Sequence, residues 1–199
     1  CALPIWPFQF GQSREHAAWM SGHQMKRVMV IGCPGAGKTT LARTLAERTG
    51  LPLVHLDQHY WSKGWTPTPR PVWIDKLKSI CAAPHWIMDG NYIGSIPQRL
   101  EYADTVVVAE KPRVECIFNV LRRTLGSLGI TRPDVAEGCP ERLNMSFLSF
   151  IWGFKARFEV EIAPLLRVAA DRGTRVIIVR RRRDLVEALS HTPLPASSA

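Results

Sequence analysis

One short stretch of the sequence has the residue types and the spacing needed to hold phosphate. Gly32-Cys33-Pro34-Gly35-Ala36-Gly37-Lys38-Thr39 fits the pattern G-x-x-x-x-G-K-[ST] in full, and Thr40 follows it. The glycines let the backbone curl, so that consecutive N–H groups point at one anion. Lys38 is expected to reach the β- and γ-phosphates, and the Thr39 hydroxyl is a suitable ligand for Mg²⁺. We therefore predict that loop 32–40 binds a nucleoside triphosphate; a glycine-rich turn without phosphate is the alternative.

Two acidic residues come directly after apolar segments, where ligands gather at the carboxyl ends of parallel strands. Asp89 follows His-Trp-Ile-Met, and we predict it as the second Mg²⁺ ligand, through a bound water, because a phosphate loop needs a partner acid. An Asp that caps the turn before Gly90 is the alternative. Asp57 follows the segment 53–56. It could orient or deprotonate an acceptor hydroxyl, bind Mg²⁺ itself, or cap a turn.

Other side chains near these carboxylates are candidates for contact with the acceptor. We assign this role to Tyr60, Asn91, Tyr92 and Arg99. The ring-bearing residues between 59 and 65 are equally compatible with a packed flap.

A mobile arginine is expected over the transferred group, because phosphoryl transfer spreads charge over the oxygens of that group. The candidates are Arg99, Arg122, Arg123, Arg132 and Arg142, although each alone could be a solvated surface charge. We assign the role to Arg122, Arg123 or Arg132. Segment 126–142 is polar and broken by glycine and proline. We predict that a lid which excludes water covers about 122–145.

The elements that must position these residues alternate along the chain. Apolar segments at 28–31, 53–56, 85–88, 105–109 and 176–179 predict short buried strands. Residues 38–49 predict a helix, because Leu41 and Leu45 share a face and Gly50 is a C-terminal stop signal. Pro71 can open another helix. Alternating strands and helices indicate an α/β fold, in which a parallel sheet is covered on both faces and makes three layers.

Two apolar stripes mark a helical region between the last two strands. The first consists of Val114, Ile117, Phe118, Leu121, Leu125 and Leu128, and the second of Phe147, Phe150, Ile151, Phe154 and Phe158. The spacing of the second, aromatic stripe predicts that it faces the core rather than a ligand. Pro164 is expected to kink or end the second helix, and Asp184 to cap a last helix.

The composition limits the class of protein. With 199 residues, 46% of them hydrophobic, the chain is expected to form one globular domain at 25–190. Residues 1–24 are expected to be a tag, an extension or a docked arm, and 191–199 a disordered tail. The net charge of +9 favours anionic partners such as nucleotides or nucleic acid, although dispersed surface arginines would give the same charge. The five cysteines include no CxxC pair, which predicts neither a zinc site nor a disulfide framework and fits reduced thiols in the cytoplasm.

Five stretches of the sequence resemble the adenylate-kinase-related P-loop kinases, and more closely the bacterial DNA topology modulation protein group. They are MKRVMVIGCPGAGKTTLA, VHLDQHYW, WIMDGNY, RPDVAEGCPERL and VIIVRRRRDL, and they cover nearly everything except the two ends. The resemblance implies a five-stranded sheet in the order 2-3-1-4-5, ATP and Mg²⁺ as cofactors, and a lid.

The sequence departs from this resemblance on the acceptor side. Adenylate kinases have Asp-Gly-Phe-Pro-Arg after the third strand, whereas this chain has Asp89-Gly90-Asn91-Tyr92-Ile93, without the arginine that contacts the acceptor nucleotide. An Asp after the second strand, as at Asp57, is more similar to small-molecule kinases of the shikimate type. In those kinases a carboxylate holds a substrate hydroxyl.

These patterns support three hypotheses of function. The first is a cytoplasmic phosphotransferase that uses ATP and Mg²⁺ and acts on an unidentified small acceptor. Its predicted catalytic residues are Lys38, Asp57, Asp89, Arg122, Arg123 and Arg132. The second is a nucleic-acid-associated regulatory protein that binds ATP, motivated by the net charge and the basic run 180–183. The third is a plain NTPase with water as the acceptor.

Overall fold

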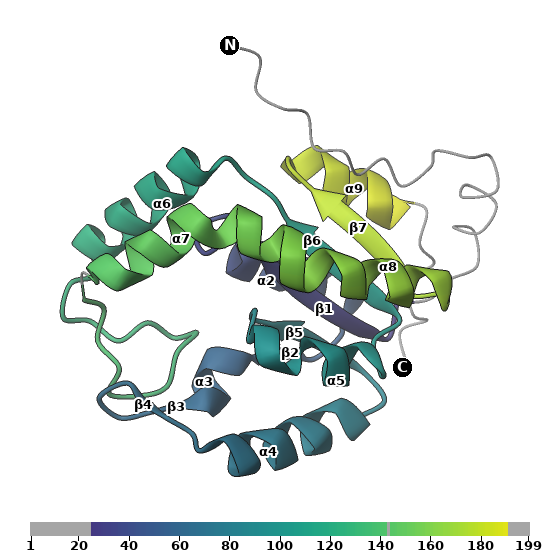
Figure 1. Ribbon diagram of the computed structural model, residues 1–199, viewed down its shortest axis with the longest axis horizontal. Helices are drawn as coiled ribbons and strands as arrows, with labels where there is room; N and C mark the ends of the chain where they lie inside the picture. Colours follow the sequence, from purple (N-terminus) through teal and green to yellow (C-terminus); the bar gives the residue numbers. More distant parts are fainter. Residues whose placement is uncertain (1–24, 143, 191–199) are drawn as a thin grey trace.

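The computed structural model describes residues 25–142 and 144–190, and its centre is a five-stranded parallel sheet. The strands are β1 (Arg27–Gly32), β2 (Leu53–His55), β5 (Trp86–Asp89), β6 (Thr105–Ala109) and β7 (Arg175–Val179). They are arranged in the order β2-β5-β1-β6-β7 (Figure 1), which is 2-3-1-4-5 when only these five strands are counted. The predicted α/β fold and sheet order are confirmed.

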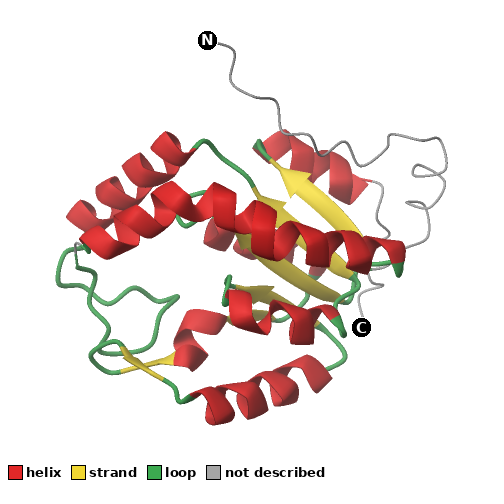
Figure 2. Ribbon diagram, viewed as in Figure 1, coloured by secondary structure: helices red, strands yellow, loops and turns green. Residues whose placement is uncertain are grey.

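Helices connect the strands and cover both faces of the sheet (Figure 2). They are α2 (Lys38–Thr49), α3 (Leu56–Tyr60), α4 (Arg70–Ala82), α5 (Ile96–Leu100), α6 (Arg113–Gly126), α7 (Met145–Arg157), α8 (Ala163–Asp171) and α9 (Arg182–Ser190). The prediction for α2 is confirmed at both ends, where Gly50 adopts a left-handed conformation with φ 71 and donates to the carbonyl of Ala46. Pro164 lies in the first turn of α8, and a π-helical turn, Phe158–Ile162, joins α7 to α8.

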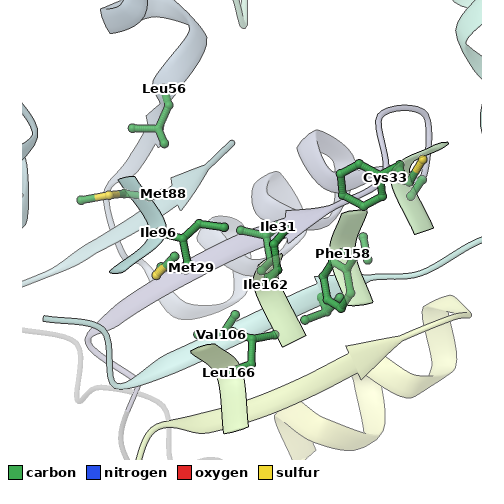
Figure 3. Packing of buried hydrophobic residues seen from close by; sticks show 14 of the residues in the cluster. Met29, Ile31, Cys33, Leu56, Met88, Ile96, Val106, Phe158, Ile162 and Leu166 are labelled. Atoms are coloured by element: carbon green, nitrogen blue, oxygen red, sulfur yellow. The ribbon is translucent and has the colours of Figure 1, made fainter. Parts of the chain in front are cut away.

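The side chains of the sheet alternate between two hydrophobic cores, as the period of two along a strand requires. Met29 and Ile31 of β1 face one core, with partners that include Val106, Ile162 and Leu166 (Figure 3). The neighbouring residues Val28 and Val30 face the other core, which α2 and α9 complete with Ala42, Leu45, Leu185 and Leu189.

The first apolar stripe is largely exposed on α6, so most of it does not belong to the core. Val114, Phe118 and Leu125 are 66%, 62% and 67% exposed, whereas Cys116, Val120 and Thr124 are the buried residues of this helix. These three smaller residues repeat every fourth position, so they also form one helix face. Cys116 of this face lies against Gly35 of the phosphate loop, and Thr124 donates to the carboxylate of Glu141. The second stripe does contribute Ile151, Phe154 and Phe158 to the core.

Several short elements lie outside the main sheet. The strands β3 (Trp61–Ser62) and β4 (Thr66–Pro67) form a small antiparallel hairpin between α3 and α4. The predicted N-terminal extension and C-terminal tail lie outside the described residues. Within the described ranges, no helix has both the length and the apolar character needed to cross a bilayer.

Candidate active site

The phosphate-loop motif connects β1 to α2 with the geometry of an anion cradle. Gly35 and Gly37 have φ of 86 and 91, a region that side chains disfavour. A Cβ on Gly35 would collide with the carbonyl oxygen of Cys116, so this position accepts only glycine. The N-terminus of α2 has no side-chain cap and no acidic residue in its first turn. Its N–H groups and the positive end of its dipole therefore face the space where a phosphate would bind.

Lys38 is held over this loop. Its amine donates a hydrogen bond to the carbonyl oxygen of Cys33, 3.2 Å away. Burial lowers the pKa of Lys38, and the nearby carboxylates of Asp89 and Asp57 oppose that shift. Lys38 thus lies between the two acidic residues that the sequence singled out, close to the loop that would hold the phosphates.

Asp89 forms a compact polar group with two other residues. The Thr39 hydroxyl donates to Asp89 Oδ2 over 2.7 Å, and Nδ1 of His55 lies 3.1 Å from the same oxygen. Burial alone would raise the pKa of Asp89, but the contacts with His55, Lys38 and Thr39 hold it below its usual value. The carboxylate is therefore ionised throughout the neutral range.

The other oxygen of Asp89 makes this group a candidate cation site. Oδ1 is buried and has no hydrogen-bond partner among the described residues, an arrangement that calls for a further ligand. A hydroxyl and a carboxylate are the oxygen donors that Mg²⁺ takes alongside the phosphates of a nucleotide. Within the described part of the chain, no cluster of three or more His, Cys, Asp or Glu side chains could hold a metal by itself.

His55 is a site residue that the sequence reasoning missed. It is the last residue of β2 and pairs in register with Asp89 of β5. The sequence placed a strand at 53–56, but it did not show that His55 would lie beside a carboxylate of another strand. The one available signal was a polar residue at the carboxyl end of a buried strand.

Asp57 is the other acidic residue that the sequence singled out. It lies in the first turn of α3, and its Oδ1 accepts a hydrogen bond from the hydroxyl of Tyr92 over 2.5 Å. Burial raises the pKa of Asp57, and the Tyr92 hydrogen bond opposes the shift. Tyr92 has a φ of 37, so its backbone is strained in order to direct the hydroxyl toward Asp57. A carboxylate with a raised pKa is a better proton acceptor than an ordinary one.

Tyr60 packs with two neighbouring rings. Its ring centroid lies 4.6 Å from that of Tyr92 and 5.1 Å from that of Trp73. Of the two interpretations that the sequence left open for the segment near residue 60, this contact fits the packed flap.

Asn91 and Arg99 have structural partners rather than a place facing an acceptor. The Asn91 amide accepts from the N–H of Gly32 and donates to its carbonyl, which fixes the loop after β5 to the start of the phosphate loop. Arg99 is completely buried, and its guanidinium donates to the carbonyl oxygens of Gly90 and Asn91. Arg99 therefore supports the segment that carries Tyr92, instead of making the predicted contact with the acceptor.

Two of the three predicted arginines converge on the site. Glu141 is buried, and its Oε1 lies 2.6 Å from Nε of Arg132 and 3.3 Å from Nε of Arg123. Arg132 also pairs with Asp134 over 3.1 Å. Electrostatic interactions connect Arg123 with Lys38, and Arg132 with Asp57. Burial lowers the pKa of Arg123, and the nearby Arg132 lowers it further. Arg122 lies on the exposed side of α6, so it is not part of this group.

The predicted lid contains the loop between α6 and α7, and this loop is joined to the β3–β4 hairpin. Trp65 Nε1 donates to the carbonyl of Pro140 over 2.9 Å, and the Gly64 N–H donates to the carbonyl of Gly138 over 2.9 Å. In Figure 1 the loop and the hairpin lie side by side, at the left of the view. The predicted lid and the β3–β4 hairpin therefore contact each other directly; we call them the two covers of the candidate site.

Comparison with known proteins identifies the fold. No protein-family model and no curated protein matches the chain. The crystal structure of an inferred kinase from Chloroflexus aurantiacus covers 85% of this chain and 100% of its own, at 18% identity and a TM-score of 0.52. The chain has the P-loop kinase fold. The shikimate kinase of Bacteroides thetaiotaomicron covers 83% of this chain and 95% of its own, at 15% identity and a TM-score of 0.49.

Proposed function

We propose that this protein is a Mg²⁺-dependent phosphotransferase that moves the γ-phosphoryl group of ATP to a hydroxyl group of a small acceptor. The observation that carries this proposal is the convergence of three groups at one edge of the sheet. They are the amine of Lys38 over the phosphate loop, the Thr39–Asp89 pair beside it, and the Asp57 carboxylate opposite. A site built only to hold a nucleotide has no need of the third group.

The chain's own residues have distinct roles in this reaction. The loop N–H groups and Lys38 hold the β- and γ-phosphates, and Thr39 and Asp89 would hold Mg²⁺. Bound Mg²⁺ would offset negative charge on the phosphate oxygens. Asp57 accepts the proton of the acceptor hydroxyl as the new bond from oxygen to the γ-phosphorus forms and the bond to ADP breaks. Arg123 and Arg132 would stabilise the charge of the transferred group.

A screen for acceptor-dependent ADP release tests the proposal. Hydroxyl-bearing metabolites, nucleosides and nucleotides are offered with ATP and Mg²⁺, and ADP is measured by a coupled assay. At least one acceptor class is expected to stimulate ADP release. Basal hydrolysis that no acceptor changes would instead establish a plain NTPase.

Two variants distinguish the parts of the site. Lys38→Ala is expected to lower turnover at least about a hundredfold, because it removes a charge from the transferred phosphates. Lys78→Ala is the matched control, since Lys78 lies on the exposed surface of α4. Asp57→Asn is expected to keep nucleotide binding and lose transfer. If both Lys38→Ala and Asp57→Asn keep full turnover, the proposal is wrong.

A further inference from the structure

Two cysteines far apart in the sequence meet behind the phosphate loop. Cys33 is the second residue of the loop motif, and Cys116 lies in the first turn of α6. The Cys33 thiol donates to the carbonyl of Ile151 over 4.0 Å, the Cys116 thiol donates to the carbonyl of Lys111 over 3.8 Å, and the two thiols interact with each other. Both belong to the same buried cluster, with Cys33 8% exposed and Cys116 0% exposed, and both are free thiols. The labelled side chain of Cys33 lies at the edge of that cluster in Figure 3.

The backbone around this pair of cysteines is tightly packed. The space beside the Cα of Gly35 is occupied by the carbonyl oxygen of Cys116. The Asn119 amide, one turn further along α6, donates to the carbonyl of Gly35 over 3.0 Å. The first turns of α6 therefore clamp the phosphate loop, and a change in the distance between the two sulfur atoms must be transmitted to the loop.

The two thiols are chemically unequal. Interaction with the neighbouring Cys33 thiol and the charge of Lys38 lower the pKa of Cys116, which favours its thiolate. Interaction with Cys116, together with burial, raises the pKa of Cys33, so this residue keeps its proton. A thiolate in contact with a second thiol is the arrangement in which oxidation leads to a disulfide rather than to higher oxides.

We propose that Cys33 and Cys116 form a reversible disulfide under oxidation by a hydroperoxide, and that this bond switches off nucleotide binding. The Cys116 thiolate attacks one oxygen of the peroxide, the O–O bond breaks, and the hydroxide released takes up a proton to become water. The sulfur of Cys33 then attacks the sulfenic acid of Cys116, with loss of its proton and of a second water. Two thiols and one hydrogen peroxide thus give one disulfide and two waters, and a dithiol reductant reverses the change.

The new bond alters the loop because it draws the two sulfur atoms to about 2.05 Å, well inside hydrogen-bond distance. The backbone carbonyl of Cys33 holds the amine of Lys38, so movement of Cys33 displaces that amine and the neighbouring N–H groups. Because Cys116 is fully covered, the oxidant reaches it only when the loop opens. A nucleotide that holds the loop closed is therefore expected to slow the reaction.

The test measures the bond and the binding separately. The full chain is treated with hydrogen peroxide, digested without reductant and mapped by mass spectrometry. The affinity for a fluorescent ATP analogue is then measured before and after treatment. We expect a peptide that links Cys33 to Cys116, at least about tenfold weaker binding after oxidation, and recovery with dithiothreitol. Because the peptide map does not depend on any activity, the bond is tested independently of the proposed phosphotransferase reaction.

Variants complete the test. Cys116→Ala is expected to bind the analogue normally and to keep that affinity after peroxide. The control is Cys81→Ala, at a buried position of α4, and it is expected to lose affinity after peroxide as the wild type does. If Cys116→Ala does not fold, Cys116→Ser replaces it. The proposal is overturned if no linked peptide forms, if it forms without loss of affinity, or if a Cys116 variant stays sensitive to peroxide.

Discussion

At the scale of single residues, Glu141 determines where two arginines can act. Its buried carboxylate faces Arg123 and Arg132, two guanidinium groups that would otherwise repel each other. The sequence predicted both arginines but had no means of assigning their partner, because an acid in a glycine- and proline-rich loop is usually solvated. The pairing depends on the path of the loop and not on any local pattern.

Glu141→Gln is expected to keep the shape of this side chain and to release the arginines. Turnover should fall about 10- to 100-fold while nucleotide affinity changes less than about threefold, because the arginines contact the group in transfer more than the bound nucleotide. Steady-state kinetics and direct binding measure the two quantities. Glu137→Gln, at an exposed position in the same loop, is the control and should change neither. An equal loss of affinity and turnover would show that Glu141 merely supports the fold.

Asp57 is a buried carboxylate whose charged form is disfavoured in the folded protein. Since burial raises its pKa, the folded protein binds a proton at this group more tightly than the unfolded chain does. Stability therefore falls as the pH rises from the ordinary carboxyl pKa of 3.8 through the raised pKa, and the cost is complete above the raised value. Below 3.8 both states are protonated and the cost vanishes.

Asp57→Asn is accordingly expected to stabilise the protein at neutral pH by about 1 kcal/mol, or about 2–4 °C in Tm, with no gain near pH ~3. Thermal unfolding at the two pH values measures this. The matched control is Asp75→Asn, because the side chain of Asp75 is 77% exposed on α4. A lower Tm at neutral pH would mean that the Tyr92 hydrogen bond to the charged form outweighs the cost of burial.

At the scale of elements, the phosphate loop and α6 constrain each other. Gly35→Ala is expected to lower the unfolding free energy by more than about 2 kcal/mol, because the new methyl group would enter the carbonyl of Cys116 at a positive φ. Denaturant titration measures the loss, and nucleotide binding should disappear with it. Gly153→Ala serves as the opposite control. It lies in the interior of α7 with open space around it, so alanine should stabilise by about 0.5–1 kcal/mol.

The same pair of elements shows what the sequence could predict. The five strands and α2 carry strong local signals, which are apolar runs and a glycine stop. The predicted ends of each element lie within one or two residues of the observed ends. The sequence did not identify the buried face of α6, because Val114, Phe118 and Leu125 repeat with the same helical period as Cys116 and Val120. The periodicity of apolar residues indicates that a helix has an apolar face. Which face is covered depends on the nearby backbone of the phosphate loop, and that contact is not local in the sequence.

At the scale of the whole molecule, the lid loop and the β3–β4 hairpin are connected across the site. Their bonds join residues from opposite sides of the sheet order, since the hairpin follows β2 and the lid follows β6. Two hydrogen bonds, Trp65–Pro140 and Gly64–Gly138, join the hairpin to the loop. We therefore expect the two covers to open together, which would couple access of the acceptor to access of the nucleotide.

Trp65→Phe tests this coupling, because it removes one N–H donor and keeps most of the ring. A neutral hydrogen bond contributes about 1 kcal/mol, so the remaining lid bonds should open about fivefold more often. Hydrogen exchange at the amides of Gly64 on the hairpin and Glu141 on the lid measures this. Trp152→Phe, on the exposed side of α7, is the control. Faster exchange at both amides would show that the covers open as one unit, whereas a change confined to Gly64 would show that hairpin and lid move separately.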